Sequence, residues 1–220
     1  MPVRKIPKNY RSITGNFPSI KNGRSMAFES ALERDYFLTL EFDHTVKSYE
    51  EQPIKITGIV EGEKVHHTPD CLVNYHGDRR PLLVQVKYQE ELDENGDDYR
   101  LRFLLAEKHA RDNSMEFRVI TDVEIRENRL RLDNFRLLYR FTSPPQNFGD
   151  CESQICSAVG DAGGHSIFDV LNGLSPERTG QAGFTPSIWH LLFVGRLKAD
   201  LEKPLNYQTI MRINHGHIVS

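Results

Sequence analysis

The stretch Thr68–Gln89, TPDCLVNYHGDRRPLLVQVKYQ, constrains the fold more than any other part of this sequence. It contains two apolar segments separated by the turn-forming residues 76–78, a pattern typical of a β-hairpin. Residues two apart in a strand share a face, so Gln85 and Lys87 point the same way, opposite to the apolar residues of their strand. In a hairpin, Asp70 at the start of the first strand lies with them at one end of a small sheet.

The segments around this hairpin predict an α/β core. Apolar residues recur at helical spacing in three segments: residues 25–42, 99–113 and 134–139. Short apolar or β-branched segments predict four strands: residues 54–60, 65–75, 82–88 and 117–120. Polar residues predict connections at 47–52, 89–98 and 122–126. A strand that follows a helix can return parallel to the sheet, so we expect a mixed sheet flanked by helices.

Charge is unevenly distributed along the chain. The formal net charge is −3, which excludes a protein that coats DNA with a uniformly basic surface. Six cationic residues nevertheless precede the first acidic residue, Glu29; they are Arg4, Lys5, Lys8, Arg11, Lys21 and Arg24. This basic arm, residues 1–24, predicts contacts with DNA phosphates, and a solubilising terminus of irregular structure is the alternative.

The sequence predicts a cytoplasmic protein without disulfides. No apolar run approaches the roughly 18 residues that a membrane span needs, and the N-terminus lacks the apolar core of a signal peptide. The three cysteines are Cys71, Cys151 and Cys156, an odd number. Cys151 and Cys156 could begin a metal site with His165, but no second close pair follows, which favours two ordinary thiols.

Several polar residues of the predicted core could act together on a phosphodiester. They are Glu29 or Glu33 on the first predicted helix, and Asp70, Gln85 and Lys87 on the hairpin. Carboxylate and amide oxygens suit Mg²⁺, and the backbone carbonyl of Val86 is a further potential ligand. Lys87 could orient a water molecule or, with a depressed pKa, take its proton, so that attack on a phosphodiester becomes feasible.

The order of these elements resembles the restriction-endonuclease-like, or PD-(D/E)xK, nucleases. The motif stands as residues 68–70, TPD, followed by residues 85–87, QVK, with glutamine in place of the commoner acid. Glutamine is expected at this place in TnsA, the endonuclease subunit of heteromeric, Tn7-like transposases. Leu32–Ile56 resembles that family's helix with the catalytic glutamate and the EQ-containing segment after it. Val119–Phe141 resembles its TD-x-E-I strand and the following helix, so the likeness covers roughly Ala27 to Phe141.

This resemblance implies a site, a cofactor and partners. The implied catalytic residues are Glu33, Asp70, Gln85 and Lys87, and the implied metal ligands are Asp70, Gln85, Val86 and Glu33. Glu33 is preferred over Glu29 because LE-x-x-x-F-L-x-L-E aligns on Leu32–Glu41. The implied cofactor is Mg²⁺, with Mn²⁺ expected to substitute. The family cuts the 5′ strands at transposon-end DNA, while a TnsB-like transposase acts on the 3′ strands.

A smaller C-terminal domain is expected after the core. The segment Thr142–Gly149, TSPPQNFG, predicts the boundary, because its two prolines stop any helix. The expected domains are the basic arm 1–24, a restriction-endonuclease-like catalytic domain 25–143, and a partner-binding domain 150–220. Short predicted helices at 152–159, 166–171 and 187–196, with short strands or a last helix after them, fit a winged-helix-like module. The resemblance implies that this domain contacts a TnsC-like ATPase.

Two other functions stay open at this stage. One is a non-catalytic, DNA-bound adaptor that links the transposase and the ATPase regulator; retention of all four polar residues argues against it. The other is a stand-alone nuclease of the same fold, such as a repair or junction-cleaving enzyme. Gln85 and the additional C-terminal domain argue against that second alternative.

Overall fold

The computed structural model describes residues 13–160 and 163–215, which form two compact units that divide between residues 127 and 128. The sequence predicted a later boundary, at Thr142–Gly149. The division comes earlier because helix α4 (Arg129–Leu138) packs within the second unit. Its Asn134 side chain donates to two backbone carbonyls in residues 201–203, at 2.9 and 2.8 Å. The predicted boundary segment therefore lies inside the second unit.

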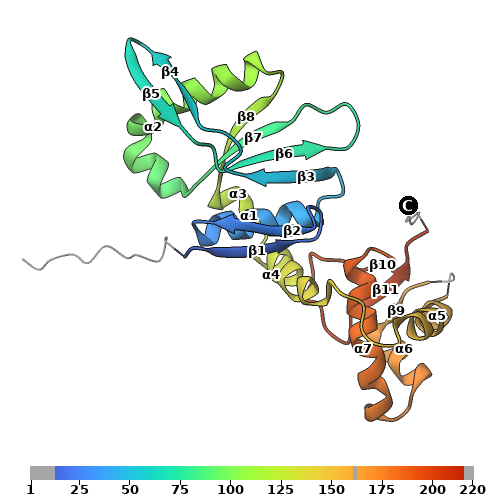
Figure 1. The fold of residues 1–220 in the computed structure, drawn as a ribbon. Coiled ribbons are helices and arrows are strands. Elements are labelled where there is room, and N and C mark those ends of the chain that lie inside the picture. Colours follow the sequence, from blue (N-terminus) through green and yellow to red (C-terminus); the bar gives the residue numbers. More distant parts are fainter. Residues whose placement is uncertain (1–12, 161–162, 216–220) are drawn as a thin grey trace, which may run out of the picture. The chain divides into compact units, whose positions relative to one another are not determined.

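A four-stranded mixed sheet forms the centre of the first unit (Figure 1). In spatial order its strands are β3 (Val46–Glu51), β6 (Cys71–Tyr75), β7 (Leu82–Lys87) and β8 (Glu116–Thr121). β6 runs antiparallel to both β3 and β7, whereas β8 runs parallel to β7. The predicted mixed sheet, its hairpin and its parallel return strand are thus confirmed. Five consecutive residues of β7 are buried, because an interior strand is covered on both faces.

Two long helices pack against β7, namely α1 (Ala31–Phe42) and α2 (Gln89–Asp112). The prediction of a loop at residues 89–98 was wrong, since these residues form the first part of α2. Acidic Glu90 and Glu91 lie in its first turn, where the helix dipole favours them, and Asn95 leaves helical geometry and marks a kink. Among the residues described, no helix is both long enough and apolar enough to cross a membrane.

The N-terminal segment is more ordered than its composition suggests. β1 (Gly15–Ser19) and β2 (Arg24–Phe28) form an antiparallel hairpin where irregular chain and the start of a helix were predicted. Met26 and Phe28 are buried while the residues between and before them are exposed, which is the two-residue period of a strand. Helix α1 consequently begins only after Ser30, whose side chain accepts a hydrogen bond from the Glu33 amide.

Three further segments differ from the prediction. Residues 65–75 form two strands, because β5 (Glu63–His67) pairs with β4 (Ile56–Val60) in a separate ribbon and β6 starts only at Cys71. Pro69 lies between them and has no N–H to continue a ladder. Most of the predicted connection 47–52 belongs to β3, and 122–126 contains the short helix α3 (Asp122–Ile125).

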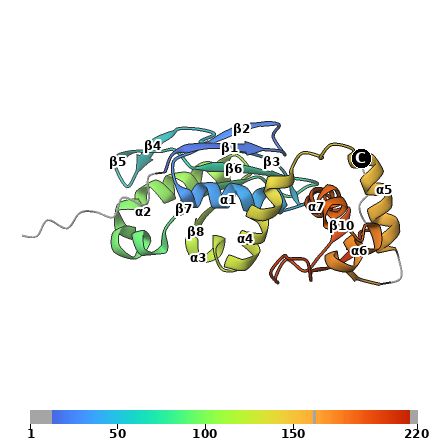
Figure 2. The same ribbon diagram turned by 90° about the horizontal axis from the view of Figure 1, so that it is seen from below.

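The second unit combines helices with a small antiparallel sheet. After α4 come the short helix η1 and helices α5, α6 and α7 (Figure 2); their bounds are Tyr139–Phe141, Phe148–Val159, Ile167–Leu174 and Arg178–Phe193. The sheet has the order β10-β11-β9, with bounds Leu197–Lys198, Ile210–Ile213 and His165–Ser166. The three predicted helices are therefore present, although α7 starts nine positions before the predicted start at Ser187.

A buried ion pair joins helix α1 to the end of α3. Asp35 is 1% exposed, and its carboxylate accepts two hydrogen bonds from the Arg126 guanidinium, at 3.0 and 2.8 Å. Arg34 donates to the other carboxylate oxygen at 3.2 Å. Because the two bonds from Arg126 come from one planar group, they fix the orientation of α1 relative to the segment that follows β8.

Replacing Asp35 should destabilise the first unit strongly. Asp35→Ala leaves the Arg126 guanidinium without its main partner in a site partly removed from water, so we expect a loss of about 3 kcal/mol in the free energy of unfolding. Urea denaturation measures this value. Glu61→Gln is the matched control, because it removes an exposed ion pair with Arg100 in the same unit and should change stability little. Equal effects of the two substitutions would contradict the structural role of Asp35.

Candidate active site

Asp70 is held by backbone hydrogen bonds where the sheet and the β4–β5 ribbon diverge. Its amide donates to the Val84 carbonyl at 2.9 Å, and its own carbonyl accepts from the Gln52 amide, also at 2.9 Å. The backbone at this position is therefore fixed on both sides, by β7 and by the end of β3. A carboxylate on such a rigid segment can be placed accurately against neighbouring groups.

The Asp70 carboxylate contacts strand β7 where β6 no longer pairs with it. The β6–β7 ladder ends at the pair of Cys71 and Val84. Beyond that pair, the Val86 amide donates to Asp70 Oδ2 at 2.6 Å, and the Gln85 side-chain amide donates to the same oxygen. The predicted convergence of Asp70 and Gln85 at one end of the hairpin is thus confirmed.

Burial raises the pKa of Asp70 to about 7. The Val86 N–H and the Lys87 ammonium act in the opposite direction, while the negative charges of Glu33 and Glu29 raise the pKa further. Both glutamates consequently lie within electrostatic range of Asp70. A carboxyl group that titrates near neutral pH is only partly ionised there, and a nearby cation would favour its charged form.

Glu33 has a structural role in addition to its charge. Its carboxylate accepts hydrogen bonds from the Glu29 amide at 2.9 Å and from the Ser30 hydroxyl at 2.8 Å, which together with the Ser30 cap make a capping box. Glu29 precedes the helix, so of the two candidate glutamates only Glu33 lies on the first helix. The Glu29 carboxylate accepts instead from the Gln52 side chain at 3.0 Å.

Lys87 is held in its charged form beside this site. Burial alone would lower its pKa, but the hydrogen bond and charge of Glu91 outweigh burial, so the pKa of Lys87 is raised. Its ammonium lies 2.9 Å from Glu91 Oε1, and the Tyr99 hydroxyl donates to that same oxygen. This environment favours a lysine that stabilises negative charge or orients a water molecule. It argues against the alternative in which a depressed pKa lets Lys87 take a proton.

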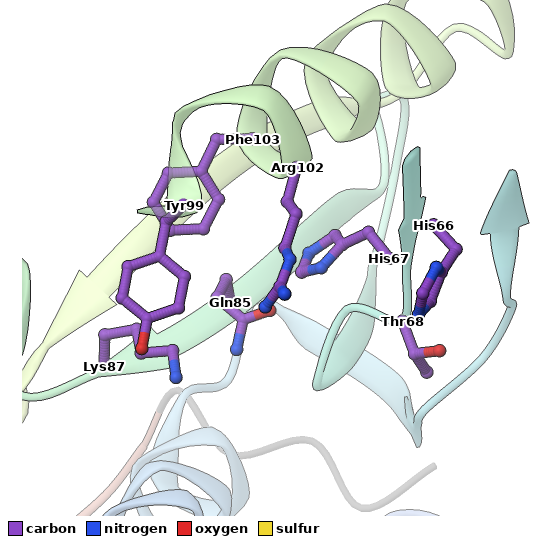
Figure 3. Close-up of a pocket in the computed structure, with 8 residues that line it drawn as sticks. All are labelled: His66, His67, Thr68, Gln85, Lys87, Tyr99, Arg102 and Phe103. Atoms are coloured by element: carbon purple, nitrogen blue, oxygen red, sulfur yellow. The ribbon is translucent and has the colours of Figure 1, made fainter. Parts of the chain in front are cut away.

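A pocket of about 250 Å³ opens beside Gln85 and Lys87 (Figure 3). Its other lining residues are His66 and His67 on β5, Thr68 directly after it, and Tyr99, Arg102 and Phe103 on α2. His67 is buried whereas His66 is exposed, as expected for neighbours in a strand. Burial and the charges of Arg102 and Lys87 lower the pKa of His67 to about 4, so its imidazole is neutral at neutral pH.

The donor set around Asp70 fits an oxygen-binding cation such as Mg²⁺ or Mn²⁺. Gln85 Oε1 is buried and has no hydrogen-bond partner in the described part of the chain, so an amide oxygen is left without its usual partner. Asp70 supplies a carboxylate, and Glu33 adds negative charge nearby. Residues 13–160 and 163–215 contain no cluster of three or more His, Cys, Asp or Glu side chains that could hold a metal ion. Such a cation would therefore depend on amide, backbone and water oxygens as well.

The predicted basic arm is only partly described. Arg4, Lys5, Lys8 and Arg11 lie outside the described residues. The Lys21 ammonium donates to two backbone carbonyls, those of Asp43 and Val46, at 2.9 and 2.7 Å. Arg24 makes two hydrogen bonds to the Glu51 carboxylate, at 2.8 and 2.7 Å. Both cations thus have intramolecular partners, and their contact with DNA stays a prediction.

Sequence reasoning missed three residues around this site. They are Glu91, Tyr99 and Arg102. Glu91 and Tyr99 belong to a stretch that was interpreted as a loop and the helix after it. The four-residue spacing between Lys87 and Glu91 was the available signal, since residues so spaced meet across a strand end and the first turn of a helix.

Comparison with known proteins places a family match on this part of the chain. Residues 43–122 match the family described as the TnsA-like endonuclease N-terminal domain. The matched range includes Asp70, Gln85 and Lys87, and Glu33 lies before it. A search of curated proteins gave no match. The resemblance to TnsA-like nucleases noted in the sequence is thus confirmed over this range, on a mixed α/β sheet.

The raised pKa of Asp70 gives a stability that depends on pH. The unfolded carboxyl group loses its proton near pH 4 and the folded group near pH 7, so the folded state binds more protons between these values. Stability therefore falls as pH rises through this window, by up to about 4 kcal/mol from this group.

Removing the ionisable group should remove this loss. In metal-free protein, Asp70→Asn is expected to raise the free energy of unfolding by about 2 kcal/mol or more near pH 8, and to have little effect near pH 4. Urea denaturation with a chelator at both values measures the difference. Asp78→Asn, in the exposed β6–β7 turn, is the control. A gain for Asp70→Asn that does not depend on pH would contradict the assigned pKa.

Proposed function

We propose that this chain, whose residues 43–122 match the TnsA-like endonuclease N-terminal domain, is the metal-dependent DNA endonuclease subunit of a Tn7-like transposase. Its reaction would be hydrolysis of the 5′ strands at the transposon ends during excision. The observation that carries the proposal is the meeting of the Asp70 carboxylate and the Gln85 amide on β7, with the charged Lys87 beside them. That cluster lies inside the range that matches the family.

The proposed ligands of the cation are Asp70, Gln85 through its amide oxygen, the Val86 carbonyl and Glu33. A bound Mg²⁺ supplies a more acidic water and neutralises charge on a phosphoryl oxygen. Such a compensating charge would favour full ionisation of Asp70 at neutral pH, because burial raises its pKa to about 7. For Glu33 to become a ligand, its carboxylate must exchange at least part of the capping box for the cation.

Lys87 is proposed to stabilise the negative charge that develops on the phosphate. Its raised pKa keeps the ammonium charged, and Glu91 and the Tyr99 ring fix its position, with Nζ 4.6 Å from the ring centroid. A fixed charge of this kind lowers the activation barrier because it needs no reorganisation during the reaction. The side chain that lies beside the reacting group is therefore held in advance by residues of α2.

The second unit is proposed to bind partners. Its helices and the small β10-β11-β9 sheet are compatible with a winged-helix-like module. The proposed partner of this module is a TnsC-like ATPase, while a TnsB-like transposase would act on the 3′ strands. The competing function is a non-catalytic adaptor with the same partners. The two functions differ in whether Asp70→Ala loses cleavage of the 5′ strand.

Strand-resolved cleavage tests the proposal. The substrate is end-labelled DNA with both ends of the transposon, incubated with the full chain, its partner transposase and ATPase, and Mg²⁺. Asp70→Ala should reduce 5′-strand cleavage on the order of a thousandfold, because the cation loses its carboxylate, while 3′-strand cleavage continues. Asp78→Ala, an exposed acid of the same hairpin, should cleave like wild type.

Three outcomes are informative. Loss of the 5′ cut alone supports the endonuclease. Replacement of Mg²⁺ by a chelator should abolish the 5′ cut, and Mn²⁺ should restore it. Identical products from wild type and Asp70→Ala, with the partners active, would mean that the chain is an adaptor.

A further inference from the structure

The pocket beside Gln85 contains two buried polar atoms that have no partner. His67 is 9% exposed and Gln85 is 6% exposed. Within the described residues, His67 Nε2 and Gln85 Oε1 make no hydrogen bond, although both residues line the pocket. Leaving such a group unsatisfied costs free energy, so a ligand that bonds to it would recover part of that cost. His67 Nε2 therefore indicates a place for a hydrogen-bonding ligand, whereas Gln85 Oε1 is the acceptor already assigned to the proposed cation.

The charge of the pocket favours an anion. Arg102 and Lys87 line it, and no carboxylate is among its lining residues in the described chain. Arg102 is exposed and forms no ion pair within the described residues. Figure 3 shows its side chain extending from α2 toward Gln85 and His67. Glu91 partly compensates Lys87 but not Arg102, so Arg102 is the cation available to a ligand.

The aromatic residues of the pocket do not favour a stacked base. The Tyr99 ring stacks on Phe103 with centroids 5.7 Å apart, and the Lys87 ammonium also lies over the Tyr99 ring. Phe103 in turn contacts His67 and Phe117, with centroids 6.2 and 6.0 Å away. These rings are packed against one another, so they act as a wall. Because the ring faces are already in contact with one another, they leave little aromatic surface for a base to stack on. A compact charged group that forms hydrogen bonds fits the pocket better than a flat ring.

We propose that the pocket binds a backbone phosphate of the DNA strand next to the phosphate that is cut. Arg102 supplies the charge, and His67 donates a hydrogen bond through Nε2–H to a phosphate oxygen. The proposal rests on the proposed function, since it takes DNA as the substrate. Gln85 and Lys87 belong to both the pocket and the candidate active site, so a phosphate held here would fix the register of the strand across Asp70.

Direct DNA binding tests the pocket without cleavage. The full chain carrying Asp70→Asn is titrated into a short labelled duplex from the transposon end at low salt, and binding is followed by fluorescence anisotropy. Arg102→Gln should weaken binding by about fivefold and reduce the salt dependence by about one phosphate contact. Arg100→Gln is the matched control: Arg100 is exposed on the same helix but forms its ion pair with Glu61 and does not line the pocket.

A phosphate scan identifies the partner group. Single methylphosphonate substitutions, which remove one phosphate charge at a time, are placed around the cut position. At one position the substitution should weaken binding of the parent but not of Arg102→Gln. His67→Phe, which keeps an aromatic ring against Phe103 and Phe117 but removes the N–H, should lose affinity at the same position and retain its melting temperature.

The outcomes separate this proposal from the proposed function. If no single methylphosphonate distinguishes Arg102→Gln from its parent, or if Arg100→Gln weakens binding equally, the phosphate pocket is wrong even where cleavage is intact. If the coupling is found but wild type does not cleave, the pocket stands and the endonuclease assignment falls.

Discussion

The hydrogen bond from the Val86 amide to the Asp70 carboxylate is the constraint on which the candidate site depends. Strand β7 pairs with β8 along its whole length, but β6 pairs with it only as far as Val84. The Val86 N–H beyond that point is left without a strand partner, and the Asp70 side chain takes that place at 2.6 Å. The site thus forms where β6 and β7 stop pairing. Asp70, which accepts the hydrogen bond from the free Val86 N–H there, also supplies the carboxylate of the site.

The hairpin was predictable because its information is local. A two-residue period, a turn and the spacing of Gln85 and Lys87 determine which side chains share a face. The start of α2 was not predictable in the same way, because its first turns are acidic and contain an Asn–Gly pair, which read as a loop. Packing of the later part of α2 against the sheet decides the outcome, and that contact is not visible in local composition.

The charged residues show a second limit of sequence reasoning. Lys21 and Glu33 are surface-like residue types, yet both have backbone partners: Lys21 binds carbonyls after α1, and Glu33 completes the capping box. Glu33 could be recognised as a cap from Ser30 three residues earlier, a signal that is compatible with a catalytic glutamate. Charge count alone cannot separate a cation that is available to DNA from one that stabilises the fold.

Helix α2 connects the chemistry of the site with recognition of its substrate. Its first turn supplies Glu91, which keeps Lys87 charged, and a later turn supplies Arg102 at the pocket. A strand phosphate bound between Arg102 and His67 would therefore be positioned by α2, the same helix that positions Lys87. Because the helix also packs on β7, displacement of α2 would disturb Lys87 and the pocket together. Substrate register and charge stabilisation would then be lost or retained as one unit, and the phosphate would supply the acceptor that His67 Nε2 on β5 otherwise lacks.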